Sequence, residues 1–479
     1  MPLRSFNTVI HLVVMAILFL ASPYAISELV MIATCMLVCW TATFLVLAPS
    51  VAETMPHKSG LAFAIVVLYW VAYLSKFALA LFIASEFWVV PLLISEAALI
   101  DSLPSAYLIA TVGYLSVLAG IFIVPNGRKF TWEIPAHQSL FMPAALLLCI
   151  ALAIKTYLKA VYSLAIPSVE PVQLDIPYAT GILSLIIDTG IIFPANIPLA
   201  MGLFRGKMSW TVVGAILALL NAGIDLGFGA KDTLIYQLII GAVMFSVAWR
   251  GPSPYLTQVR PLVRRMLVPI GIFSALVILM YPYVNPYRFA RLEGNDFFRS
   301  IEIAFSKPIY EDSNPFITIL DRITGIDVMT GVINLRNFLS NDAIMQNLFS
   351  TELVDNVALQ IFGFKQDETL FSVTQMAYFY VVGGYTTVIA GCLLVGIFFG
   401  VVQQIAVSLP VKKIMKVAFL PVMWILAAKL MLGGGNLVLA AKELSVVLGM
   451  FIACSLLAGL KRSRSTTVKA IPKVAVGET

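Results

Sequence analysis

The apolar stretch FSVTQMAYFYVVGGYTTVIAGCLLVGIFFG fills residues 371–400 and contains no charged side chain. With the residues up to 405, it is long enough to cross the hydrocarbon core of a bilayer, which takes about 20 apolar residues in a helix. Similar runs recur along the whole chain. The stretch therefore predicts the fold class, an all-α polytopic integral membrane protein.

The composition favours the same class. Hydrophobic residues make up 60% of the 479 residues and charged residues only 12%, whereas a soluble domain has about 25% charged residues. The mean hydropathy is +0.95. The net charge of +6 does not indicate a nucleic-acid partner, because the basic residues lie at the ends of apolar spans.

About twelve such spans can be placed on the sequence. The first span resembles a signal peptide, but a second apolar span follows it at once. We therefore expect the first span to be retained as a helix. The spans cover residues 7–22, 25–49, 61–84, 106–124, 140–158, 180–204, 209–228, 232–249, 266–283, 385–405, 417–434 and 437–460. They divide the chain into an N-terminal membrane region (1–282), a loop (283–371), a C-terminal membrane region (372–460) and a basic tail (461–479).

The basic residues predict the orientation of these spans. Lysine and arginine are enriched on the cytoplasmic side of membrane proteins, and here they gather at both chain ends and in every second loop. Both termini are therefore expected to be cytoplasmic. The cytoplasmic set includes Arg4, Lys58, Arg128, Arg205, Lys207, Arg260, Lys412, Lys413 and Lys461.

The loop 283–371 is the one long water-soluble segment, and this orientation places it outside the cell membrane. It carries twelve acidic and seven basic residues, a net charge of −5. Apolar residues at helical spacing in 315–338 and 343–362 predict short amphipathic helices on the outer surface. A membrane protein with its polar residues concentrated in one external loop is expected to act at that surface.

Several ionisable residues fall inside the predicted spans, where each costs several kcal/mol and is a functional candidate. All of them lie in the outer half or at the outer end of their span. Snorkelling or pairing is the structural alternative, but the one-sidedness favours a shared polar cavity for an anionic group such as a lipid phosphate. The set is Glu28, Lys76, Asp188, Asp225, Lys429, Lys442 and Glu443, with Lys155 and Lys231 at the external boundary.

Common catalytic signatures are missing from the sequence. There is no G-x-x-x-x-G-K-[ST] phosphate loop and no D-x-D pair for a nucleotide-sugar metal. The histidines His11, His57 and His137 fall in the first span or in cytoplasmic loops, which disfavours an external histidine base. The five cysteines lie within spans without zinc-type spacing, as packing residues do. We therefore predict no metal and no cofactor.

Three stretches, in this order, resemble the Wzy-type repeat-unit polymerases of bacterial O-antigen, common antigen and capsule. The first, GFGAKDTLIYQLIIGAVMF (227–245), is similar to the family's G-[ST]-R-[AG] turn and following apolar helix. The second, ILDRITGIDVMTGVINL (319–335), is similar to its loop helix, in which an arginine precedes an acidic residue. The third is the stretch 371–400, with a polar-aromatic opening, a glycine pair and a small-residue helix. The resemblance covers the C-terminal half of the chain.

The resemblance implies a glycosyltransferase-C fold in the bacterial inner membrane. The activity it implies is transfer of a growing glycan from undecaprenyl pyrophosphate to another lipid-linked repeat unit, without metal or nucleotide. Membrane lipids, a flippase and a chain-length regulator are the implied partners. The reaction needs fixed positive charge for the leaving pyrophosphate and a base for the acceptor hydroxyl.

The second stretch supplies the main candidate site residues. Arg322 is the expected pyrophosphate contact, and Asp327 is the expected base, with Asp321 and Glu311 behind it. The Gly383–Gly384 pair indicates a place where the backbone approaches a substrate or a neighbouring helix. Further candidates for binding the pyrophosphate or the glycan are Arg336, Lys231, Arg288, Arg291, Arg299, Lys76, Lys429 and Tyr380.

Two departures from the family pattern affect these roles. Lys231 stands where the family has arginine and cannot offer a planar bidentate contact. The acidic residue that often opens the third stretch is absent, and Gln375 and Tyr378 lie there instead.

Three other functions stay open from the sequence. A flippase or transporter for lipid-linked glycans would also have many spans, but transporters are typically built from related halves with broken helices in matching positions, and neither is visible here. An O-antigen ligase is disfavoured by the missing external histidine. A non-catalytic role in polysaccharide export is the third.

Overall fold

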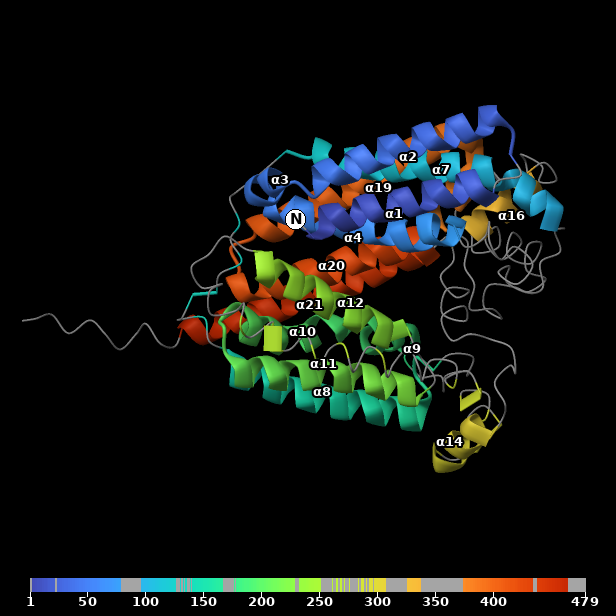
Figure 1. The fold of residues 1–479 in the computed structure, drawn as a ribbon. Coiled ribbons are helices and arrows are strands. Elements are labelled where there is room, and N and C mark those ends of the chain that lie inside the picture. The colour runs from blue at the N-terminus through green and yellow to red at the C-terminus, as the bar shows by residue number, and fades with distance from the viewer. Residues whose placement is uncertain are drawn as a thin grey trace, which may run out of the picture.

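The computed structural model is all-helical over the residues it describes, and its long helices run side by side (Figure 1). Apolar runs fold this way because a helix satisfies its own backbone hydrogen bonds where no water is present. The structure describes residues 2–21, 24–78, 96–125, 130, 132, 134–135, 138, 140–166, 176, 178–228, 232–250, 261, 264–265, 268, 271, 275, 283, 286–287, 290, 293–295, 297–306, 325–336, 374–433 and 437–463.

Within these residues, ten helical segments are long and apolar enough to cross a membrane. Each overlaps a predicted span, so the polytopic membrane class is confirmed. The segments are α1 (Pro2–Ala21), α2 (Ile26–Val46), α4 with the π-helical turn η1 (Pro56–Tyr69, Trp70–Ser75), α7 (Glu96–Ile123), α8 (Phe141–Tyr162), α9 with the π-helical turn η3 and α10 (Ala179–Leu185, Ile186–Gly190, Ile192–Phe204), α11 (Met208–Gly227), α19 (Gln375–Ser408), α20 (Lys413–Gly433) and α21 (Leu437–Ser463).

The remaining described helices are shorter or less apolar. The predicted span 232–249 forms α12 (Asp232–Arg250), whose apolar part covers only Tyr236–Phe245. The predicted span 266–283 falls largely outside the described residues. Short helices are α3 (Pro49–Thr54), α14 (Phe297–Ser306) and α16 (Ile326–Arg336).

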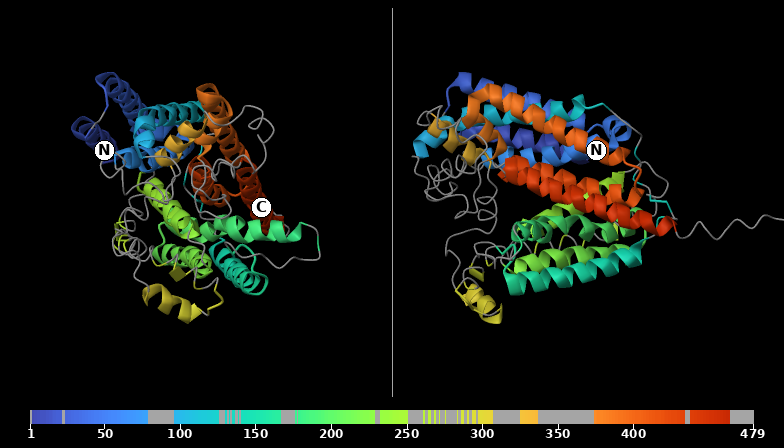
Figure 2. Two further views of the ribbon diagram at one scale, coloured as in Figure 1. Left: turned by 90° about the vertical axis from the view of Figure 1, so that its right-hand side faces the viewer. Right: turned by 180° about the vertical axis from the view of Figure 1, so that it is seen from behind.

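The membrane helices form two groups that meet at α20. α1, α2, α4, α7 and α19 pack together, and α8, α10, α11, α12 and α21 form the second group. α20 contacts members of both, including α4, α10, α19 and α21. Figure 2 shows the same division from two other sides, with α8 and α11 at the edge farthest from α1 and α2.

Glycine allows a close contact between the helices α7 and α19. A Cβ atom added to Gly120 of α7 would stand 2.9 Å from the Cα atom of Gly396, and one added to Gly396 would stand 3.0 Å from the Cα atom of Gly120. Small residues let helix backbones approach in this way in membranes, where dispersion contacts drive association. α7 and α19 are thereby held in contact along much of their length.

The helices alternate in direction, so their ends gather at two opposite ends of the bundle. One of these ends carries α16, and we call it the α16 end (Figure 1). The starts of α1, α4 and α20 and the α10–α11 turn lie at the opposite end. Basic residues predicted to be cytoplasmic gather there, among them Arg4, Lys58, Lys207 and Lys413.

α16 is the described part of the predicted amphipathic helix 315–338. Residues 326–336 are helical, but this helix does not have one exposed face as an amphipathic surface helix would. Val328, Met329 and Val332 are fully buried, because α16 packs between the ends of α7 and α19. The second predicted amphipathic helix, 343–362, lies outside the described residues.

Candidate functional site

The helix α16 is fixed to the membrane helices at both of its ends. Gly325, just before α16, lies against the backbone of Ala72 in η1, where a Cβ atom at position 325 would collide with the Ala72 carbonyl oxygen. Near the other end, the Asn334 amide donates hydrogen bonds to Ser102 Oγ at 2.6 Å and to the Ala98 carbonyl oxygen at 3.2 Å, both on α7. The second and third sequence stretches that carry the family resemblance thus contact each other, because α16 also packs on α19.

The helix α19 is broken at Gly383–Gly384. Its first turn is capped by the Thr374 hydroxyl, which accepts a hydrogen bond from the Ala377 amide at 3.3 Å. Gly384 has φ 68° and ψ −150°, a conformation that is essentially restricted to glycine. The sequence predicted only a close backbone approach at this pair.

The break folds the short first part of α19 against the second part. A Cβ atom at Gly391 would stand 2.6 Å from the Phe379 ring, although these residues would lie about 18 Å apart along a straight helix. Tyr380 and Tyr385 flank the break, with their ring centroids 5.6 Å apart in an edge-to-face arrangement. The broken segment therefore presents two tyrosines at the α16 end.

Gln375, at the start of α19, adds a polar side chain that was not assigned a role from the sequence. It is fully buried, and among the residues that the structure describes neither atom of its amide has a hydrogen-bond partner. A buried amide without a partner costs about 1–3 kcal/mol. The cost marks Gln375 as a candidate for contacting a polar ligand.

The structure brings four of the predicted site residues to this region. Lys76 is wholly buried and follows η1 directly, one helical turn beyond the Ala72 contact. Tyr380 lies at the break in α19, and the backbones of Asp327 and Arg336 lie in α16. We call Lys76, Gln375, Tyr380 and the helix α16 the α16 site.

Two predicted site residues lie elsewhere. Arg299 is on α14, which is separated from α16 in all views (Figures 1 and 2), and it forms an exposed ion pair with Glu302 at 2.6 Å. Lys429 lies on α20, between the two groups of helices. The other predicted residues are outside the described part of the chain: Asp321, Glu311, Arg322, Lys231, Arg288 and Arg291.

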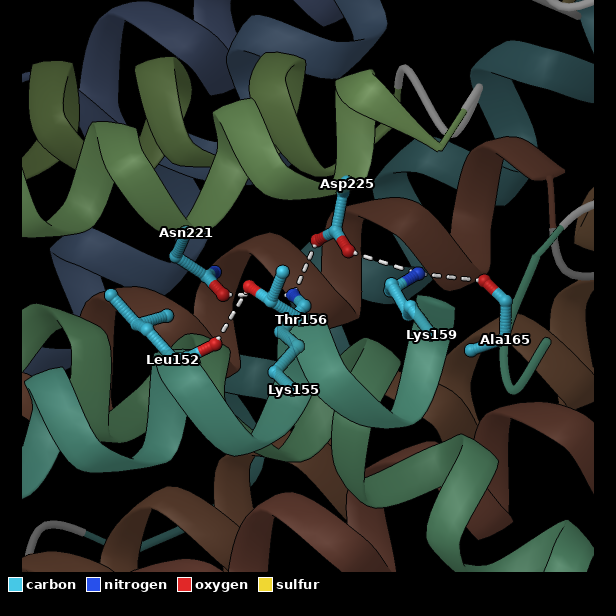
Figure 3. A network of polar contacts seen from close by, with 7 residues as sticks. All are labelled: Leu152, Lys155, Thr156, Lys159, Ala165, Asn221 and Asp225. Carbon is cyan, nitrogen blue, oxygen red and sulfur yellow. Dashed lines mark hydrogen bonds and ion pairs between the residues drawn. The ribbon is translucent and has the colours of Figure 1, made fainter. Parts of the chain in front are cut away.

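The membrane charges of the second helix group form buried ion pairs (Figure 3). Lys155 Nζ on α8 lies 2.6 Å from Asp225 Oδ2 on α11, and Lys159 Nζ lies 3.1 Å from Asp225 Oδ1. The exposed fraction of all three side chains is 0%. Lys155 also donates to Asn221 Oδ1 at 2.8 Å. We call Lys155, Lys159, Asn221 and Asp225 the lysine cluster.

A second ion pair lies between α20 and α21. Lys429 Nζ is 2.7 Å from Glu443 Oε1 and 5.3 Å from the centre of the Tyr236 ring. Asp188, on the π-helical turn η3, lies within electrostatic reach of Lys429 and of Lys159 and Lys155. π-helical turns inside α-helices are frequent at functional sites.

These pairs bear on two sequence predictions. The span predicted over 140–158 ends before Lys159, but Lys159 lies inside α8, on the same face as Lys155, as their spacing of four residues allows. Lys429 was expected to bind substrate; its charge is paired with Glu443, and the binding role stays a prediction. The sequence had already marked Lys155 and Asp225 as charges in or beside the spans, and the four-residue spacing could have added Lys159, whereas Asn221 gave no signal.

The α16 site and the lysine cluster are thus two polar regions in an otherwise apolar bundle. Comparisons of the chain with protein-family models, with curated proteins and with solved structures found no match.

Proposed function

We propose that this protein is a membrane glycosyltransferase that joins lipid-linked oligosaccharide repeat units into a polymer at the outer face of a bacterial inner membrane. The proposal rests mainly on the docking of α16 onto the broken helix α19. The second and third stretches that resemble repeat-unit polymerases meet in this contact. The positive-inside rule assigns the basic ends of the helices to the cytoplasm, and so places the α16 site outside.

The residues at the α16 site fit the chemistry of this transfer. The leaving group is a lipid pyrophosphate, whose developing negative charge needs fixed cations or hydrogen-bond donors. Lys76 and the Gln375 amide supply such groups from the membrane helices. Arg322 precedes the anchored Gly325 by three residues, a reach of at most about 11 Å. We therefore propose Arg322 as the principal pyrophosphate contact and Asp327 as the base.

The test is elongation of lipid-linked repeat units by the purified protein. The protein in liposomes should convert undecaprenyl-pyrophosphate-linked repeat units into a ladder of longer chains, and it should do so in excess chelator. Vesicles without the protein are the control. A strict requirement for added magnesium or manganese would contradict the proposed metal-independent mechanism, and no elongation at all would contradict the function.

The broken helix also favours a second candidate, a transporter of lipid-linked glycans. Discontinuous helices and charges within the membrane are typical of transporters, and both are present at the α16 end. The same liposomes distinguish the two functions. A transporter would move labelled lipid-linked repeat units between leaflets without lengthening them, whereas a polymerase lengthens them.

A further inference from the structure

The short helix α14, near the start of the loop 283–371, has two different faces. Ser300 and Ala304, one turn apart, are buried, so the protein covers this face. Phe298 and Phe305 lie seven residues apart and so share another face of the helix, away from Ser300 and Ala304. These two phenylalanines are 79% and 52% exposed. α14 thus presents an exposed apolar face.

The segment before α14 is tied to the end of a membrane helix. The Tyr287 hydroxyl donates a hydrogen bond at 2.6 Å to the carbonyl oxygen of Gly227, the last residue of α11. The side-chain amide of Asn295 donates to the Ala290 carbonyl oxygen at 2.9 Å and closes the turn before α14. This closed turn leaves about five residues of chain, roughly 18 Å when extended, between Tyr287 and α14. α14 therefore begins near the end of α11.

The end of α11 lies at a boundary of the bilayer. α11 has 20 residues, a length of about 30 Å at the rise of an α-helix, and the hydrocarbon core is about 30 Å thick. Gly227 and the Tyr287 hydroxyl then lie at the interface, where tyrosine is enriched. α14 lies beyond the ends of α8 and α11, at the margin of the bundle (Figures 1 and 2). This position is level with the phospholipid headgroups.

The phenylalanine face of α14 continues the lipid-facing surface of its neighbours. Tyr157 and Val161 near the end of α8 are exposed, as is Leu220 of α11. Apolar side chains on the outside of a membrane bundle contact lipid tails, which are as apolar as leucine. Arg299 and Glu302 are the only charged residues of α14, and they pair with each other at 2.6 Å. The helix therefore offers apolar contact without net charge.

We infer that α14 is an interfacial helix that inserts Phe298 and Phe305 into the phospholipid bilayer beside α8 and α11. Helices of this kind bury their apolar face about 5–10 Å into the boundary between headgroups and acyl chains. The predicted orientation makes this the outer leaflet. The partner is the phospholipid surface, held by apolar side chains rather than by charge. The inference stands independently of the proposed glycosyltransferase activity.

Single cysteines that carry a bimane fluorophore test this insertion. Phe298→Cys and Phe305→Cys probe the apolar face, and Arg299→Cys probes a position about 100° around the helix from Phe298. Ile154→Cys, exposed on α8, is the lipid-facing control. Each protein, stripped of its native cysteines, is placed as one copy in a phosphatidylcholine nanodisc, which removes a second copy as an occupant. The quenchers are phosphatidylcholine spin-labelled on its acyl chain and iodide in the water.

Spin-labelled lipid should quench bimane at 298 and 305 at least about twofold more than bimane at 299, because only the first two positions reach the acyl boundary. Iodide should quench position 299 most, and the label at 154 should respond to lipid alone. Adding Phe305→Gln should weaken lipid quenching at 298, since the helix then loses one of its two apolar contacts.

Potassium chloride at 1 M, where the Debye length is about 3 Å, should leave lipid quenching at 298 unchanged. Loss of that quenching in salt would overturn an apolar contact. Quenching of 298 and 305 by iodide but not by lipid would place the face in water and overturn the inference. Shielding of both positions from both quenchers would show that protein covers the face, which would overturn it as well.

Discussion

Gly325 and Ala72 lie in backbone contact, although one precedes the loop helix α16 and the other belongs to the membrane helix that carries Lys76. The contact links the loop 283–371, through its residue Gly325, to the interior of the bundle. It fixes where α16 begins, and it places the loop helix one turn from a fully buried lysine. The α16 site depends on this contact.

Gly325→Ala should displace α16, because the new Cβ atom would collide with the Ala72 carbonyl oxygen. Forcing a methyl group into a packed contact costs about 1–3 kcal/mol. We expect normal membrane insertion but shorter glycan chains, measured as a chain-length ladder at matched protein levels. Gly449→Ala is the matched control, since a Cβ atom there meets nothing within 4 Å. Equal ladders from both variants would show that α16 has no role in elongation.

Gly384→Ala should destabilise the break in α19. At φ 68° and ψ −150° an alanine is strained by about 1–3 kcal/mol. The melting temperature and the elongation rate should both fall. Gly241→Ala in α12, again with no atom within 4 Å of the new Cβ, should leave both unchanged. A Gly384→Ala protein with the wild-type melting temperature and elongation rate would mean that neither stability nor elongation requires the break.

Arg322→Ala should leave cells with single, unpolymerised repeat units. Loss of one donor to a developing charge costs on the order of 3 kcal/mol, a hundred-fold or more in rate. Arg322→Lys should rescue elongation only in part, because an ammonium group cannot make a bidentate contact. Wild-type ladders from the alanine variant, at matched protein level, would remove Arg322 from the site.

The Lys429–Glu443 pair should contribute stability rather than substrate binding. Lys429→Met leaves the Glu443 carboxylate without its partner, at a cost of about 1–3 kcal/mol or more. The double variant Lys429→Met with Glu443→Leu should recover most of this loss, because no unpaired charge remains. Thermal unfolding of the wild type, of the single variants Lys429→Met and Glu443→Leu, and of the double variant completes the cycle. Elongation that stays low in a stable double variant would instead support the predicted binding role of Lys429.

The orientation can be tested with single cysteines in a protein stripped of its native ones. Glu302→Cys on α14 should react with a membrane-impermeant thiol reagent in intact spheroplasts, since Glu302 is 66% exposed. Ser209→Cys, exposed near the start of α11 at the basic end, should stay protected until the membrane is opened. Labelling of position 209 in sealed cells would show that the orientation is the reverse of the predicted one.

The sequence by itself determined the membrane class and most of the helices. An apolar run of spanning length can satisfy its backbone hydrogen bonds only within itself, so each span is a local property of its own residues. The basic residues at the ends of the spans are likewise a local property, so the sequence alone also predicts which helix ends face the cytoplasm. For this reason the stretch 371–400 predicted a membrane helix from its own composition.

Only the tertiary structure decided which polar residues meet. Lys155 and Asp225 are 70 residues apart in the chain, and their ion pair exists because α8 packs on α11. Asn334 reaches α7 across 232 residues, and α7 itself is held to α19 through Gly120 and Gly396. Pairings of this kind depend on helix packing, which is set by shape and volume between distant segments rather than by any local pattern.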